Sequence, residues 1–545
     1  MYASVEGKKF STLKKFQRDE DGSLVMFSLF IFLAMLMFGG IAVDLMLYEN
    51  RRTHIQNSTD RAVLAAANLN QTVDPTLVVQ DYLAKVGVEV SEDDVTVVEI
   101  GEAPVITGRQ VSVTVNSDGD TLLMDLVGVD SLPYGATSEA EEGVNDVEVS
   151  LVLDISGSMY GTKLSRMQDA ASEFVDGILE GASDNRVSVS LIPYAAQVSA
   201  GPDLLSRIDI THEHSLSNCV NFTSDDFGTT AMHRTESVDV AGGGGVLPNN
   251  IPLSQTAAFD PWRSFQQHYS LRYPVCRDDN VDILPWSNDA TELKNRIDLL
   301  TANGNTSIDV AVKWASALLD PSMNSVLNDM IADEDYDMNP NFTFRPREFT
   351  YPDVIKVIVV MTDGVNTTQY ALNDDVKEGY SDIYYEELPL DPSDPPEFIL
   401  RVDEDTWWNM NDREYVDPPA SSDAELATLR LSNLEMWSKM SMRWRAYNGW
   451  YRRTWNANDY YDQLDDHRVA IGQTAKNNRL DDICDAAKDN NVVIFSIGFE
   501  VTDFGASVME NCASTPSHFY RVEGLDIDYA FASIKNQINK LKLTQ

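Results

Sequence analysis

The chain has 545 residues, of which 41 are Lys or Arg and 86 are Asp or Glu, so its formal net charge is −45. This acidic balance argues against a nucleic-acid-binding role, because phosphates are bound by basic surfaces. Hydrophobic residues make up 43% of the chain, too many for a disordered acidic tail. The length allows roughly three to four folded units.

One long apolar run lies near the N-terminus. Residues 24–43 carry no charge and number about 20, enough for a helix to cross a bilayer. Basic residues precede the run and Asp44 follows it, so the charge bias predicts a cytoplasmic tail at 1–22 and an external remainder. A cleaved secretory signal is the alternative, but the run exceeds a signal core and no clear cleavage motif follows it. We therefore expect a retained single-pass anchor.

A helix is expected to continue beyond the run, giving one helical unit at 23–71. Residues of its apolar face recur every three or four positions, at Ile55, Thr59, Ala62, Ala66 and Leu69. The pattern ends at Asp74-Pro75. The segment resembles the N-terminal segment of TadE/TadG-type proteins of tight-adherence (Flp) pilus assembly, on Gly22, Asp44, Gln56, Asp60-Arg61-Ala62 and Ala65-Ala66-Ala67. Phe27 stands where pilin precursors of such systems carry Glu, so the resemblance is to TadG-like proteins rather than to pilins.

Residues 72–145 are expected to form a small membrane-proximal α+β unit. Val95 to Ile100 and Gln110 to Val115 have strand patterns, and Asn116 to Gly119 has turn composition. We identify no catalytic or ligand-binding motif in this unit.

Polar residues follow two buried strands in the remainder of the chain, 146–545. The strand Val147 to Asp154 leads into Ser156 and Ser158, and the strand Lys356 to Met361 leads into Asp363. Between them, Thr306 precedes a helical pattern. Open α/β sheets place ligand sites at the carboxyl ends of their strands, so these side chains could meet.

The whole set resembles a von Willebrand factor A (VWA) domain with a metal-ion-dependent adhesion site (MIDAS). The resemblance implies a doubly wound, Rossmann-like α/β fold in which hydroxyl and carboxylate oxygens hold a divalent cation. The implied metal residues are Asp154, Ser156, Ser158, Thr306 and Asp363. Such oxygen ligands suit Mg²⁺, with Mn²⁺ or Ca²⁺ as alternatives. Alternatively, the two serines merely form turns and cap the helix expected near Lys163.

Enzyme motifs are not apparent, and we expect no enzyme activity. Ile155 to Gly161 lacks the spacing of a serine nucleophile elbow. His212-Glu213-His214 does not match a zinc protease motif, and the glycine run 242–245 has no following Lys-Ser or Lys-Thr, so it is not a phosphate-binding loop.

Two insertions interrupt the VWA pattern, at about 196–286 and 371–466. Both exceed ordinary connections, so they are expected to be functional or to form subdomains. The second contains six of the nine Trp, and we expect these rings to form its own core, with an aromatic binding surface as the alternative.

The four cysteines are expected to form disulfides, because an even number in an exported chain favours pairing. The expected pairs are Cys219 with Cys276 and Cys484 with Cys512. Other connectivities and buried free thiols are the alternatives.

The sequence therefore predicts a TadG-like pilus-assembly protein of the bacterial envelope. One membrane helix would anchor it, and a periplasmic or extracellular VWA domain would bind an acidic residue of a protein partner, such as a pilus or secretion component, through its metal. An adhesin that binds host or matrix surfaces is the alternative, and an envelope hydrolase is a weaker one.

Overall fold

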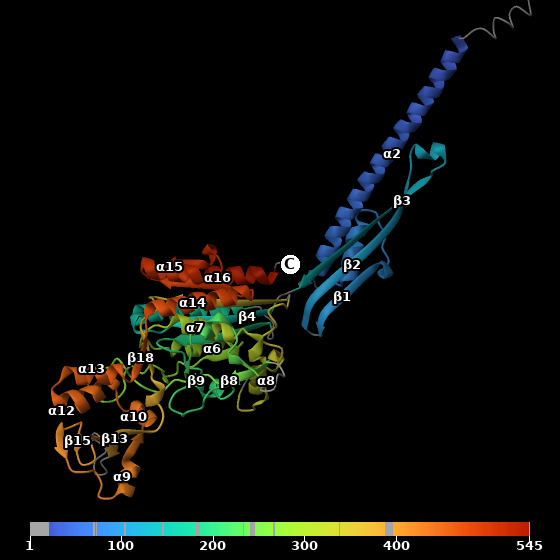
Figure 1. Ribbon diagram of the computed structural model, residues 1–545. Coiled ribbons are helices and arrows are strands. Elements are labelled where there is room, and N and C mark those ends of the chain that lie inside the picture. The colour runs from blue at the N-terminus through green and yellow to red at the C-terminus, as the bar shows by residue number, and fades with distance from the viewer. Residues whose placement is uncertain are drawn as a thin grey trace, which may run out of the picture. The chain divides into compact units, whose positions relative to one another are not determined.

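The computed structural model describes residues 21–68, 71, 73–102, 105–143, 146–180, 186–232, 234–239, 246–264, 268–336, 338–351, 353–386 and 396–543 (Figure 1). The basic residues before the apolar run, Leu69 and the glycine run 242–245 lie outside these residues. The chain forms two compact units, Met1–Val144 and Asn145–Thr544.

The first unit begins with the long helix α2, Asp21–Ala67. Among the described residues it is the one helix long and apolar enough to cross a membrane. Its C-terminal part carries the predicted apolar face, and Ile55, Thr59, Ala62 and Ala66 are buried there. The apolar run and the amphipathic segment are therefore one continuous helix.

An antiparallel sheet packs against the C-terminal part of α2. Its order is β1 (Val95–Glu102), β2 (Val105–Asp120) and β3 (Ser131–Gly143). The helix α3 (Pro75–Ala84) precedes the sheet and is capped by Asp74, which accepts N–H groups of its first turn. The predicted turn at 116–119 is wrong, because these residues pair with β3 and prolong the strand. The chain reverses later, through the short helix η2, Met124–Val127.

The second unit contains a six-stranded sheet. Its order is β10 (Leu284–Ser287), β5 (Val187–Tyr194), β4 (Asp146–Asp154), β11 (Val354–Thr362), β19 (Val493–Phe499) and β20 (Phe519–Val522). All neighbouring pairs are parallel except β10 with β5. Since β10 belongs to this sheet, the first insertion ends before the predicted residue 286.

Helices cover both faces of this sheet. Successive side chains of the central strands point to opposite faces, so each strand contributes apolar residues to two cores. Val357, Val359 and Met361 share one core with α4 (Thr162–Leu179), α6 (Ala290–Asp298) and α16 (Asp526–Leu543). Ile358 and Val360 share the other core with α7 (Ile308–Ala317), α14 (Gln473–Asp489) and α15 (Asp503–Cys512). The predicted doubly wound α/β class is confirmed.

The first insertion follows β5 and has little regular structure. Its elements are α5 (Gly201–Leu205), β6 (Val220–Asn221), β7 (Arg234–Asp239), β8 (Val246–Ile251) and β9 (Ser254–Gln255). A further helix, α8 (Asn324–Ala332), lies between α7 and β11. Apolar residues of this insertion join the core beneath α7, so it is packed onto the domain rather than hanging from it.

The second insertion forms a subdomain with a five-stranded sheet. The sheet contains β13 (Tyr380–Glu386), β14 (Glu397–Arg401), β15 (Trp407–Asn409), β16 (Glu414–Val416) and β17 (Arg430–Ser432). Helical segments accompany it: α9 (Asp423–Leu429), α10 (Asn433–Lys439), α11 (Met442–Arg445), η8 (Ala446–Tyr451), α12 (Arg452–Thr454) and α13 (Ala457–Asp465). A pair of strands, β12 (Gln369–Leu372) and β18 (Arg468–Ile471), joins its two ends to the domain.

Most tryptophans of the second insertion pack inside it, as predicted. Trp408, Trp437 and Trp444 belong to its main apolar core, and Trp450 packs against that core. Trp455 is the exception, with 64% of its surface exposed.

Candidate metal site

Asp154 lies at the carboxyl end of the central strand β4, fully buried. The register of β4 with β11 places it next to Thr362, whose hydroxyl donates to Asp154 Oδ2 at 2.7 Å. The Ser156 N–H donates to Asp154 Oδ1 at 2.8 Å, which fixes the start of the following loop. Tyr194, from β5, points its hydroxyl at the same carboxylate at 3.4 Å.

Ser156, Ser158 and Asp363 meet at this edge of the sheet. The two serine hydroxyls lie 3.0 Å apart, and the Ser158 hydroxyl donates to Asp363 Oδ1 at 2.6 Å. The Lys163 ammonium, from the first turn of α4, donates to Asp363 Oδ2 at 2.8 Å and lies 3.6 Å from Glu500. Four of the five predicted residues therefore form one connected group.

Thr306 is carried by a neighbouring loop. The Gly157 N–H donates to the Gly304 carbonyl and the Asn303 N–H donates to the Ile155 carbonyl, each at 2.9 Å. A Cβ at Gly157 would lie 3.3 Å from the Gly304 oxygen, so glycine permits this close approach of the two loops. Within the described residues the Thr306 hydroxyl makes no hydrogen bond, and no hydrogen bond joins Thr306 to the other four site residues.

The electrostatics of the group favour a cation. Burial, followed by the charge of Asp363, raises the pKa of Asp154 to about 6, although hydrogen bonds from Thr362 and Ser156 oppose the shift. Lys163 is the ammonium paired with Asp363. An additional positive charge would therefore stabilise the ionised form of Asp154.

The donors present fit a hard divalent cation. They are hydroxyl and carboxylate oxygens, which Mg²⁺ and Ca²⁺ prefer over soft ligands. No group of three His, Cys, Asp or Glu side chains that could hold a metal occurs in the described part of the chain. The cluster His212-Glu213-His214 lies in an irregular loop, where His214 Nδ1 accepts the Leu216 N–H at 3.1 Å.

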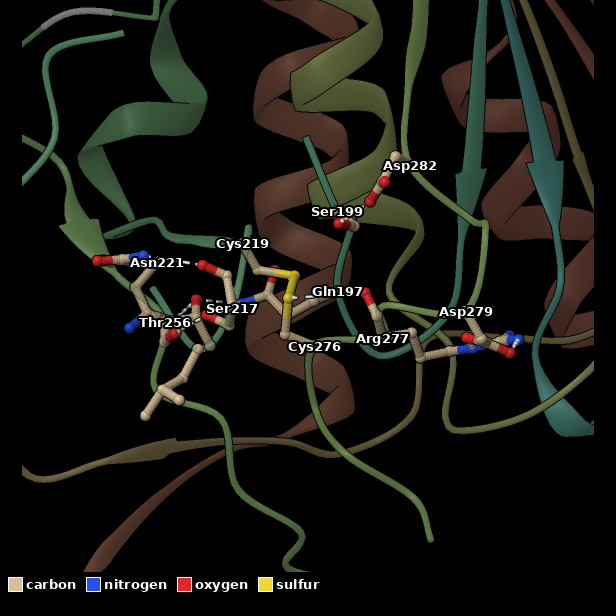
Figure 2. Close-up of a disulfide and its surroundings, with 12 residues drawn as sticks. Gln197, Ser199, Ser217, Cys219, Asn221, Thr256, Cys276, Arg277, Asp279 and Asp282 are labelled. Carbon is tan, nitrogen blue, oxygen red and sulfur yellow. Dashed lines mark hydrogen bonds and ion pairs between the residues drawn. A yellow bond between two sulfur atoms is a disulfide. The ribbon is translucent and has the colours of Figure 1, made fainter. Parts of the chain in front are cut away.

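Arg277 connects the two loops of the site and was not identified from the sequence. It is 6% exposed and lies at the end of the first insertion. Its guanidinium donates to the carbonyl of Ile155 at 3.3 Å and to that of Thr301 at 2.8 Å. Asp279 receives two hydrogen bonds from it, at 2.8 and 2.6 Å, beside the disulfide of Cys276 (Figure 2).

A second buried cation also supports the Thr306 loop. The Lys476 ammonium, on α14, donates to the carbonyls of Thr306 at 2.8 Å and Thr367 at 3.0 Å. Burial lowers the pKa of Lys476 to about 8, although Asp309, 3.7 Å away, opposes the shift. Neither Arg277 nor Lys476 lies in a recognisable motif, so neither could be identified from the sequence.

Both predicted disulfides are confirmed. Cys219 pairs with Cys276, and Cys484 pairs with Cys512. The first links Cys219, directly before β6, to the segment that carries Arg277, so it joins two parts of the first insertion (Figure 2). The second joins α14 to the end of α15.

Comparison with known proteins gives one family match. Residues 22–69 match the family model "Putative Flp pilus-assembly TadE/G-like", so the predicted N-terminal resemblance is confirmed over that segment. No curated protein matches the chain.

Several solved structures are similar in part. The vWF domain of the type V pili tip protein Mfa5 from Porphyromonas gingivalis is 14% identical, covers 74% of this chain and 97% of its own, and has a TM-score of 0.32. The pilus adhesin SpaC from Lactobacillus rhamnosus GG is 13% identical, with 82% of this chain and 35% of its own covered and a TM-score of 0.29. The pilus adhesin RrgA from Streptococcus pneumoniae is also 13% identical, with 82% and 48% covered and a TM-score of 0.29. This chain thus spans about a third and about half of the two adhesins, and likenesses at this level leave the function open.

Proposed function

We propose that this chain is a membrane-anchored pilus-assembly protein of the tight-adherence type, whose VWA-like domain binds a protein partner through a divalent cation. The observation that carries the proposal is the meeting of Asp154, Ser156, Ser158 and Asp363 at the carboxyl edge of the sheet, with the Thr306 loop bonded alongside. The TadE/G-like segment and the apolar run of α2 support the anchor and the pilus context. The bulk of the chain would lie outside the cytoplasm.

The site residues would divide the work of holding Mg²⁺. Ser156, Ser158 and Thr306 would offer hydroxyl oxygens, and Asp154 and Asp363 would bind directly or through water. Lys163 would keep Asp363 in place through its Oδ2 atom. When bound, the cation would supply one open coordination position for a carboxylate of the partner.

The charge of the chain makes such recognition selective. A formal charge of −45 repels acidic partners at long range, so an acidic residue can dock only where a cation and matching shape compensate. We therefore infer a binding role for the site rather than a catalytic one.

Calorimetric titration of Mg²⁺, Mn²⁺ and Ca²⁺ into the full chain in lipid nanodiscs tests the proposal. Saturable binding should occur in the wild type and be lost in Asp154→Asn and Ser158→Ala. Asp528→Asn, an exposed carboxylate on α16, is the matched control and should bind normally. If both site variants bind the cations as tightly as the wild type does, these residues do not form the metal site.

A further inference from the structure

The connection between β2 and β3 in the first unit carries exposed apolar side chains where polar turn residues are usual. Leu122 is 71% exposed and Leu126 is 81% exposed, and Leu123 and Val127 are also exposed. We call residues 122–127 the hairpin tip. A cluster of exposed apolar side chains indicates a surface that contacts a membrane or another protein.

The hairpin tip is held firmly against α2. The carboxylate of Asp44, itself 4% exposed, accepts the backbone N–H groups of Leu122 at 3.0 Å, Leu123 at 2.8 Å and Met124 at 2.6 Å. A Cβ at Gly40 would lie 2.9 Å from Leu123 Cβ, so the glycine allows the tip to approach the helix. The hydrogen bonds and the close contact fix the level of the tip along α2 at Gly40 to Asp44.

That level is the end of the apolar run of α2. Gly40 lies within the uncharged residues 24–43, about 6 Å before Asp44 at the rise of an α-helix. One turn beyond Asp44, the ring of Tyr48 lies 6.3 Å from that of Tyr134 on β3. Tyrosines are enriched at membrane–water interfaces, so this pair marks the expected boundary.

A basic residue marks the same boundary. Arg51, a further turn along α2, donates to the carbonyl of Asp120 at the end of β2, at 3.1 Å. Arginines near the end of a span extend toward the interface, where their charge stays hydrated. Along α2 the order is therefore apolar run, hairpin tip, aromatic pair and then the cation.

We propose that the hairpin tip is a membrane wedge: its leucines insert into the bilayer leaflet beside α2, on the side where the sheet lies. This inference rests on α2 as the membrane anchor and is independent of the metal site. The occupant is lipid rather than a protein because the exposed leucines continue the exposed apolar surface of α2, where Phe38 is 73% exposed. Asp125, the charged residue of the tip, lies beside Asp130, next to the start of β3.

A wedge would give the anchor a fixed orientation. A single membrane helix is free to rotate and to change its tilt unless neighbouring groups or interfacial residues restrain it. A second apolar element bonded to one side of α2 would restrain both motions. The sheet β1–β3, which packs against α2 in the same unit, would thereby keep a fixed orientation toward the membrane.

Spin labelling of the full chain in phosphatidylcholine–phosphatidylglycerol vesicles tests the proposal. All four native cysteines are in disulfides, so Leu126→Cys introduces a single free thiol for a nitroxide. Thr137→Cys is the matched control on the same hairpin, because the Thr137 carbonyl accepts from Gln56, about 18 Å beyond Asp44 along α2. Phe30→Cys reports on the anchor itself. Collision with oxygen, which concentrates in lipid, is compared with collision with a water-soluble nickel chelate.

The nitroxide at Leu126→Cys should be several-fold more accessible to oxygen relative to nickel than the one at Thr137→Cys, and should resemble the one at Phe30→Cys. Adding Asp44→Ala should remove this difference, since the tip loses its attachment to α2. If Phe30→Cys is in lipid but Leu126→Cys is as nickel-accessible as Thr137→Cys, the wedge is refuted and the anchor stands. If Phe30→Cys is also exposed to nickel, both the anchor and the wedge are wrong.

Discussion

Replacing Asp154 by Asn should stabilise the metal-free protein and at the same time remove its response to Mg²⁺. Burial and the charge of Asp363 raise the pKa of Asp154 to about 6 from the ordinary 3.8. Each pKa unit corresponds to about 1.4 kcal/mol, so the ionised carboxylate costs the folded state about 3 kcal/mol at neutral pH. Asn carries no charge and can still accept the Ser156 N–H and donate to the Thr362 hydroxyl.

The pH dependence follows from the direction of the shift. Because the folded-state pKa of Asp154 is the higher one, the cost is complete above about pH 6 and disappears below the unfolded value near 3.8. The advantage of Asp154→Asn should therefore grow as the pH rises from about 4 to 7.

Thermal unfolding in EDTA measures this effect. In a domain of this size, about 3 kcal/mol corresponds to a rise in Tm of roughly 3 to 6 °C at pH 7.5. Mg²⁺ at about 100 times its Kd should stabilise the wild type by about 2.7 kcal/mol and leave Asp154→Asn unchanged. If the variant unfolds at a lower temperature than the wild type in EDTA, the Asp154 charge does not destabilise the fold; if Mg²⁺ still stabilises the variant, Asp154 does not hold the cation.

Three further results are expected. Arg277→Lys should weaken Mg²⁺ binding about 10- to 100-fold in calorimetry, because Lys cannot hydrogen-bond both loops as the guanidinium does. Unchanged affinity, with normal amide exchange at Asn303, would show that the arginine does not position the site. Replacing Cys484 and Cys512 by Ser should lower the free energy of unfolding by about 3 to 4 kcal/mol in urea titration, since the bridge closes a loop of 28 residues, and an equal midpoint would contradict this. Burial lowers the pKa of His467, so the imidazole binds a proton more tightly in the unfolded chain than in the folded one. Stability should therefore fall as the pH drops below about 6.5. Unfolding followed by Trp fluorescence should show this loss in the wild type and a smaller one in His467→Gln.

The sheet and the loops of the candidate site could be predicted because their signals are local. A buried strand such as Val147 to Asp154 is a mostly apolar run that ends in a carboxylate, and burial on both faces is typical of a central parallel strand. Once two such strands are neighbours, the residues after them must lie at one edge. The meeting of Asp154 and Asp363 was therefore expected from the strand pattern taken together with the VWA resemblance.

The supporting cations could not be predicted in the same way. Arg277 lies in an irregular insertion, and its partners Ile155 and Thr301 are distant in sequence. Lys476 is on a helix whose local pattern gives no reason for a buried ammonium. Such contacts depend on where the insertions pack, which hydrophobic periodicity does not specify.

The first unit shows two further limits of local patterns. Turn composition at Asn116 to Gly119 was overruled by cross-strand pairing with β3, because an extended partner satisfies more backbone groups than a turn would. The leucines of residues 122–127 match no motif. Their position beside α2 is known only from the hydrogen bonds between the tip and Asp44.

Anomalous diffraction from crystals grown with Mn²⁺ would locate the bound cation itself. We expect one strong manganese peak at the carboxyl edge of the sheet, about 2.1 Å from the hydroxyl oxygens of Ser156 and Ser158. The same peak should be absent from crystals of Asp154→Asn. A wild-type crystal with no manganese at this edge, or with its only peak elsewhere, would show that these residues do not hold the cation.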